Sequence, residues 1–200
     1  MNAATGYRLG KRAVTRERTR RRILEAAERL YLGRWYDDVS LRSVAAEAGV
    51  ALQTVVNHFG SKGALLVAVA ESVGERIDRR RDEVGPGDAA AGVAMLVDEY
   101  EEVGDGIVRM IALEGRVEEL SPLLAHGRAV HRRWVERVFA DALSAARGAE
   151  RERRAVMLIA ATDVLTWKIL RREQRLGRAA AEEAMRESVL ALLDRFGSRP

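Results

Sequence analysis

Polar side chains that suit recognition of hydrogen-bonding edges are concentrated in the segment from Gly49 to Lys62, GVALQTVVNHFGSK. In a helix of 3.6 residues per turn, Gln53 and Asn57 would share one face while Val55 would lie on the opposite one. Glutamine and asparagine amides bond the edge of adenine in the DNA major groove, where an α-helix fits. A small helical subdomain with a solvated polar face is the alternative interpretation.

Two short helices around Gly49 would position this face. Ser40 is a suitable N-cap for a helix that begins at Leu41, and Gly49 can adopt the left-handed conformation of a tight turn. A further helix is expected over about 52–59. Two short helices crossing around such a turn form a helix-turn-helix.

The rest of the chain predicts an all-α fold of about nine helices. Apolar residues repeat at three and four positions almost throughout, and only three prolines interrupt the pattern. We expect a helix-turn-helix domain with a basic N-terminal arm over residues 1–64 and a larger helical domain over 65–200. In the second domain the helices after the long fourth one are expected at about 89–103, 107–119, 122–147, 150–175 and 179–196.

Composition excludes several classes of site. The 200 residues include no cysteine, so disulfides and thiolate chemistry are ruled out. His126 and His131 are five residues apart, about 140° around a helix, and do not share a face for a metal ion. Because the sequence contains no apolar run of membrane-spanning length and no signal peptide, we expect a cytoplasmic protein without metal or cofactor.

Positive charge is concentrated at the N-terminal end. Residues 1–64 hold 12 Lys or Arg and 6 Asp or Glu, a net charge of +6, whereas the remaining residues carry a net charge of −2. This distribution is typical of a head that binds a polyanion. The basic segment from Tyr7 to Arg22 has two interpretations, a DNA-contacting arm whose arginines enter the minor groove or a solvated tail.

The segment from Arg21 to Leu66 closely resembles the N-terminal DNA-binding domain of the tetracycline-repressor (TetR) family. The resemblance lies in an ILEAA first helix, the VSLRSVAAEAGV segment and an HFGSK element that leads into a long helix. It implies a homodimeric repressor whose paired third helices enter successive major grooves of an operator. It also implies a helical C-terminal domain that dimerises and binds a small-molecule effector.

The resemblance assigns DNA contacts to individual residues. Those implied to contact base edges are Leu52, Gln53, Thr54 and Asn57, and those implied to contact phosphate or the backbone are His58, Lys62, Ser40, Arg42 and again Thr54. Two positions depart from the family pattern. Ala51 stands where a capping serine or threonine is usual, and Val56 stands where a tyrosine is usual, so the borrowed contacts transfer less directly.

The second domain has candidate dimer and effector residues. The segment at 150–175 is apolar on two faces and the last helix on one, so the two resemble the family's dimer-forming pair; a purely intramolecular core is the alternative. Polar and aromatic side chains of the middle helices could line an effector pocket. These candidates are Tyr100, Met110, Glu114, His131, Trp134, Thr162, Asp163 and Trp167.

Three functions therefore compete. The first is a repressor released from double-stranded operator DNA by an unknown small-molecule effector. The second is a DNA-binding architectural or developmental factor without an effector. The third is a helical enzyme or binding module that keeps the head without using it, although no catalytic constellation stands out in the sequence.

Overall fold

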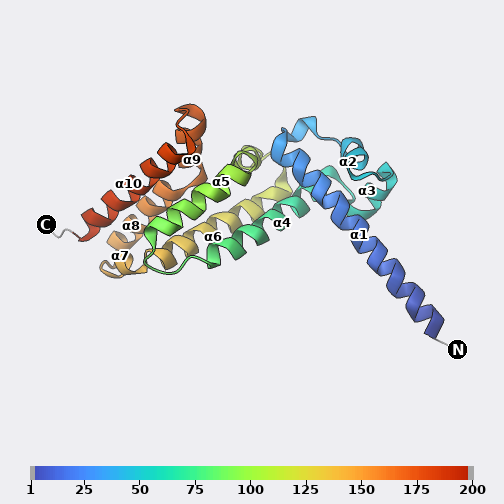
Figure 1. The fold of residues 1–200 in the computed structure, drawn as a ribbon, viewed down its shortest axis with the longest axis horizontal. Coiled ribbons are helices and arrows are strands. Elements are labelled where there is room, and N and C mark those ends of the chain that lie inside the picture. Colours follow the sequence, from blue (N-terminus) through green and yellow to red (C-terminus); the bar gives the residue numbers. More distant parts are fainter. Residues whose placement is uncertain (1–2, 198–200) are drawn as a thin grey trace. The chain divides into compact units, whose positions relative to one another are not determined.

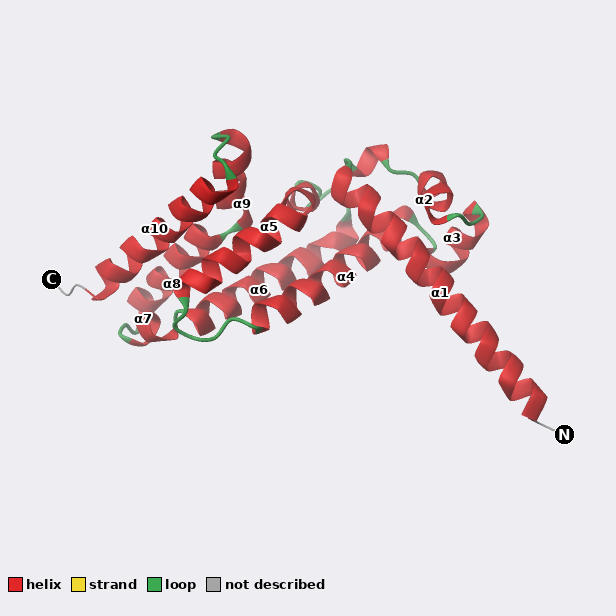
Figure 2. Cartoon of the chain, in the orientation of Figure 1, coloured by secondary structure: helices red, strands yellow, loops and turns green. Residues whose placement is uncertain are grey.

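The protein is all-helical in the computed structural model, which describes residues 3–197 and the side chains of residues 13–197 (Figure 1). No strand occurs among these residues, so the predicted all-α fold is confirmed (Figure 2). The chain forms two compact units, residues 1–72 and 73–200, and the division falls inside α4. The α-helices are α1 (Ala3–Gly33), α2 (Leu41–Ala48), α3 (Leu52–Phe59), α4 (Lys62–Asp82), α5 (Ala89–Ile111), α6 (Ser121–Val138), α7 (Ala140–Ser144), α8 (Gly148–Thr162), α9 (Val164–Lys168) and α10 (Arg178–Gly197).

The first unit packs α2 and α3 against the second half of α1 and the start of α4. The α1 stripe that includes Ile23 and Ala27 is fully buried, as are Val44 of α2 and Val55 of α3. Leu65 continues this core from α4. Each short helix therefore gains its stability mainly from one buried face, because isolated helices of eight residues are marginal in water.

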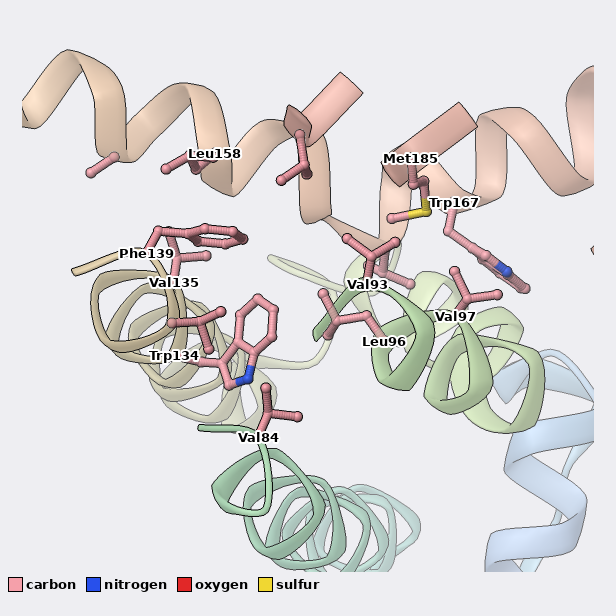
Figure 3. Packing of buried hydrophobic residues seen from close by; sticks show 14 of the residues in the cluster. Val84, Val93, Leu96, Val97, Trp134, Val135, Phe139, Leu158, Trp167 and Met185 are labelled. Carbon is pink, nitrogen blue, oxygen red and sulfur yellow. The ribbon is translucent and has the colours of Figure 1, made fainter. Parts of the chain in front are cut away.

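The second unit is built around α5, which packs against α6, α9 and α10. Valines and leucines of α5 meet two tryptophans and Met185 in one apolar cluster (Figure 3). The tryptophans are Trp134 of α6 and Trp167 of α9, which are 2 % and 0 % exposed. Among the described residues no helix is both long and apolar enough to span a membrane.

One predicted boundary is absent from the structure. The sequence predicts that the Asp105-Gly106 pair separates two helices, but α5 continues through it to Ile111. Gly106 is buried within the helix, so it serves packing rather than a turn. The chain then turns and forms a 3₁₀ segment, η2 (Glu118–Leu120), in place of the helix expected at 107–119.

Two predicted helices are divided. The segment at 122–147 is interrupted at Phe139, between α6 and α7. The segment at 150–175 is interrupted at Asp163, whose extended backbone ends α8 and whose carboxylate accepts a 2.8 Å hydrogen bond from the Leu165 N–H to start α9. A π-helical turn, η3 (Ile169–Glu173), follows α9. Asp163 is therefore an N-cap inside an otherwise apolar run.

A close approach between α5 and Trp167 depends on the absence of a side chain at Gly104. A Cβ atom at this position would lie 2.7 Å from Cζ3 of the fully buried indole. The neighbouring ring cannot move aside easily, because protein interiors are close-packed. Gly127 of α6 provides the contrast, since a Cβ atom added there would have no neighbouring atom within 4 Å.

Gly104→Ala is expected to lower the free energy of unfolding by about 1–3 kcal/mol, since overpacking forces neighbouring groups off their preferred positions. Gly127→Ala is the matched control and should raise it by about 0.5–1 kcal/mol through helix propensity alone. Urea denaturation of both variants measures the difference. Equal effects at the two positions would contradict the proposed steric role of Gly104.

Candidate DNA-binding surface and effector domain

The turn between α2 and α3 has the local geometry that the sequence predicts. The Ser40 hydroxyl accepts a 3.0 Å hydrogen bond from the Ser43 N–H, and the Ser43 side chain bonds back to the Ser40 N–H. This reciprocal arrangement is a capping box. Gly49 ends α2 in the left-handed conformation with φ of 62°, so the two helices cross as a helix-turn-helix.

The outward face of α3 presents two amide side chains side by side. Val55 is fully buried and fixes the helix on the core, whereas Leu52 is 38 % exposed. Gln53 and Asn57 are exposed, and Gln53 Nε2 donates a 2.9 Å hydrogen bond to Asn57 Oδ1. The structure therefore brings these two residues together on one accessible edge, in the arrangement suited to base recognition.

The remaining implied contact residues lie around this edge in different states. Thr54 and His58 are half-buried, and the His58 ring centroid lies 6.2 Å from that of Phe59. Arg42 is exposed and, within residues 13–197, forms no hydrogen bond or ion pair. Ser40 uses its hydroxyl for the capping box.

Lys62 is engaged inside the protein at the beginning of α4. Its Nζ atom lies 4.0 Å from the centroid of the Tyr36 ring, a cation–π contact. Partial burial lowers the pKa of the Lys62 ammonium group, against the opposing effect of Asp37 and Asp38. A phosphate at this position would have to compete with the aromatic ring.

The two departures from the family pattern have visible consequences. Ala51 is the N-cap residue of α3 and provides no side-chain hydrogen bond to the first turn. Val56 is half-buried and has no hydroxyl to offer a phosphate. Neither residue disturbs α3, which runs its full eight residues.

Two arginines of the basic segment hold the helix-turn-helix, a role that the sequence pattern did not reveal. Arg22 donates hydrogen bonds to the carbonyls of Ala48, at 2.6 Å, and Gly49, at 3.3 Å. The Arg20 guanidinium lies 5.1 Å from the centroid of the Phe59 ring. No local signal separates these arginines from their neighbours in the run RERTRRR, because their partners are 26 or more residues away.

Four of the candidate effector residues form the buried interior of the second unit. Tyr100 donates a 2.9 Å hydrogen bond to the Thr162 carbonyl, and Thr162 Oγ1 lies 3.1 Å from His131 Nε2. Thr162 Oγ1 also donates to the Leu158 carbonyl, so it accepts from His131 Nε2, which identifies the tautomer of the neutral ring. Trp134 packs its ring against His131 with the centroids 5.8 Å apart.

A buried ion pair adjoins this network. Arg81 of α4 bonds Glu99 of α5 at 2.6 Å, and its Nη1 atom lies 3.3 Å from His131 Nδ1. Burial lowers the pKa of His131 to about 3, and the positive charge of Arg81 acts in the same direction. Burial also raises the pKa of Glu99, although Arg81 opposes this shift. His131 is therefore neutral at physiological pH.

The other candidates are dispersed around the unit. Trp167 donates a 2.9 Å hydrogen bond from Nε1 to Glu101, and Met110 is buried. Glu114 pairs with Arg128 on the surface, and Asp163 caps α9. Their part in effector binding stays a prediction.

Comparison with known proteins identifies the first unit. Residues 23–69 match the family model described as bacterial regulatory proteins, tetR family. A comparison with curated protein sequences gave no significant match.

Solved structures share the fold of most of this chain. A tetR-family transcriptional regulator from Streptomyces coelicolor superposes with a TM-score of 0.72 at 20 % identity, covering 92 % of this chain and 90 % of its own. A transcriptional regulator from Rhodococcus sp. Rha1 gives 0.73 at 19 % identity, covering 90 % and 99 %. A multidrug binding protein, EbrR, complexed with imidazole gives 0.60 at 23 % identity, covering 86 % and 88 %.

The matched segment contains the helix-turn-helix and its outward amide pair. The tetR-family regulators that this segment matches are DNA-binding proteins and not enzymes.

Arg22→Gln is expected to lower the free energy of unfolding by about 1 kcal/mol, the net contribution of one or two partly exposed hydrogen bonds to carbonyls. Arg21→Gln, at an exposed neighbouring position, is the matched control and should change it by less than about 0.5 kcal/mol. Chemical denaturation followed by circular dichroism measures both. An Arg22 variant as stable as the Arg21 variant would contradict the proposal that the Arg22 hydrogen bonds stabilise the helix-turn-helix.

Proposed function

We propose that this chain, a tetR-family DNA-binding regulator of transcription, is a homodimeric repressor that a small-molecule effector releases from its operator. The observation that carries the DNA-reading part is the exposed amide pair of Gln53 and Asn57 on α3. Both amides project from a helix that Val55 fixes on the core. Rigid support of this kind favours specific recognition, since the reading groups keep a fixed geometry.

Base reading is assigned to Leu52, Gln53, Thr54 and Asn57. Leu52 is apolar and 38 % exposed, which suits contact with a thymine methyl group, and the two amides suit adenine. Arg42, exposed and without an internal partner among the described residues, is available for a phosphate. The positions of His58 and Lys62 support phosphate contacts less strongly, because both side chains already pack against aromatic rings.

Dimerisation is assigned to the last helices of the second unit. Most of the exposed large apolar side chains of residues 13–197 lie there, on α8, α9, η3 and α10. Monomeric surfaces rarely gather such residues, so a second copy is the occupant that the proposal gives this face. The residues are Val156, Leu165, Ile169 and Leu190.

Release by an effector is assigned to α4. This helix begins in the DNA-binding unit at Lys62 and ends in the second unit at Asp82, so it belongs to both. A ligand that favours one position of its C-terminal turns would change the placement of α3 relative to its dimer mate. Operator binding would weaken because the two recognition helices must match half-sites one helical turn apart.

Gln53→Ala and Asn57→Ala are each expected to weaken specific operator binding by about tenfold or more, since a good bidentate contact contributes about 1–3 kcal/mol of discrimination. Gel shift with the DNA upstream of the chain's own gene, with and without non-specific competitor, measures the affinity. Gln174→Ala, an identical change at an exposed site of the second unit, is the control. No specific complex with the unaltered protein, or equal affinity for all three variants, would overturn the assignment.

Val156→Glu combined with Leu190→Glu is expected to raise the dimer dissociation constant by about tenfold or more, because each substitution buries an unpaired charge. Analytical ultracentrifugation measures the change. Val14→Glu, at a 70 % exposed valine of α1, is the control and should remain dimeric. A dimer that persists in the double variant would move the interface elsewhere.

A further inference from the structure

A hollow lies between α4 and α6 in the second unit. It has a volume of about 340 Å³, which lies within the usual range of small-molecule sites. Of the sequence-predicted effector residues only Trp134 borders it. The lining consists of Asp78, Arg81, Asp82, Val130, Arg133, Trp134 and Arg137.

Two of the lining residues, Trp134 and Arg137, each carry a buried hydrogen-bond donor that has no acceptor. Trp134 is 2 % exposed, and its Nε1 atom is buried without a partner. The indole cannot turn away freely, because it lies close to α5, where a Cβ atom at Gly92 would be only 3.2 Å from Trp134 Cζ2. In Figure 3 the indole nitrogen lies on the ring edge facing the helix that leads to Val84.

Arg137 Nε is the second unpartnered buried donor. Buried donors are nearly always satisfied in folded proteins, so each exception requires an explanation. A ligand that supplies acceptor oxygens in the hollow would satisfy both donors.

The lining contains one cation and one anion that have no hydrogen-bonded or ion-pair partner among the described residues. Arg81 is paired with Glu99, and Arg137 with Asp82 at 2.9 Å. Arg133 and Asp78 form no hydrogen bond or ion pair within the described part of the chain, although the charge of Asp78 acts on Arg81. The two unpaired charges come from different helices, α6 and α4, and border the same space.

We infer that this hollow binds a small zwitterion of the amino-acid type with an apolar side chain. Its carboxylate accepts hydrogen bonds from the Trp134 indole, from Arg137 Nε and from Arg133. Its ammonium group lies against Asp78, and its apolar part packs on Val130 and the Trp134 ring. The regulatory consequence rests on the proposed function. By holding α4 against α6, the bound ligand would act as the effector, and the effector class would be the amino acids.

The test uses three probes that share one phenyl group: L-phenylalanine, 3-phenylpropanoate and phenethylamine. Isothermal titration calorimetry on the full chain, without DNA, is expected to show L-phenylalanine binding about tenfold more tightly than either single-charge probe. Nuclear magnetic resonance of the indole N–H groups, assigned with Trp134→Phe, provides a second readout. The two carboxylate-bearing probes should move the Trp134 indole N–H signal downfield, as a new hydrogen bond does, whereas phenethylamine, whose phenyl group alone contacts the ring, should not produce this downfield shift.

Two variants separate the two charges. Asp78→Asn should bind L-phenylalanine no better than 3-phenylpropanoate, and Arg133→Gln should bind it no better than phenethylamine. The matched controls are Asp141→Asn on α7 and Arg128→Gln on α6, which remove the same charges outside the hollow.

Failure of the ligand class and failure of the regulatory link give different results. No binding of any probe up to about 10 mM, equal binding of all three, or equal effects of Arg133→Gln and Arg128→Gln would overturn the ligand class. Because the calorimetric titration is done without DNA, none of these results bears on operator binding. L-phenylalanine that binds but leaves the gel-shift affinity unchanged would overturn the regulatory link alone.

Discussion

The second unit depends on the burial of one ion pair, Arg81 with Glu99. A charge removed from water must be paired and hydrogen-bonded. The end of α4 and the middle of α5 must therefore lie where Arg81 and Glu99 can bond each other. The network continues through His131 on α6 and Thr162 on α8. Directional bonds therefore connect the four helices α4, α5, α6 and α8. The surrounding apolar cluster fills the interior of the unit but would tolerate small shifts of these helices. The hollow lies next to this network, and Arg81 belongs to both.

The sequence predicts the fold best where structure is determined locally. Ser40, Gly49 and the buried stripe around Val55 act within a few residues of their own positions, and the helix-turn-helix follows from them. The longer helices are predicted less accurately, because their boundaries depend on packing. Gly106 continues α5 because it is buried, whereas Asp163 divides an apolar segment by capping α9. The Arg81–Glu99 pair joins residues that are 18 apart in sequence, and no sequence pattern predicts it.

The basic N-terminal segment has two kinds of arginine that composition cannot separate. Arg20 and Arg22 contact α3 and the turn, whereas Arg16, Arg18 and Arg21 form no hydrogen bond or ion pair with residues 13–197. Net charge therefore overstates the number of cations available to a phosphate backbone. The shared face of Gln53 and Asn57 was predictable, because the two residues are one helical turn apart, whereas their direct bond required the structure.

That bond has a consequence for the search along DNA. Without DNA, Gln53 Nε2 donates to Asn57 Oδ1, so one donor and one acceptor of this edge are already engaged. On the proposed function, a non-cognate base pair that cannot bond both amides would leave this bond in place, and the protein would be held only by sequence-independent phosphate contacts, which permit sliding. A cognate adenine would replace the internal bond with its own N6 and N7 contacts. On the proposed function, stopping on DNA would therefore require a base that replaces the bond between Gln53 and Asn57.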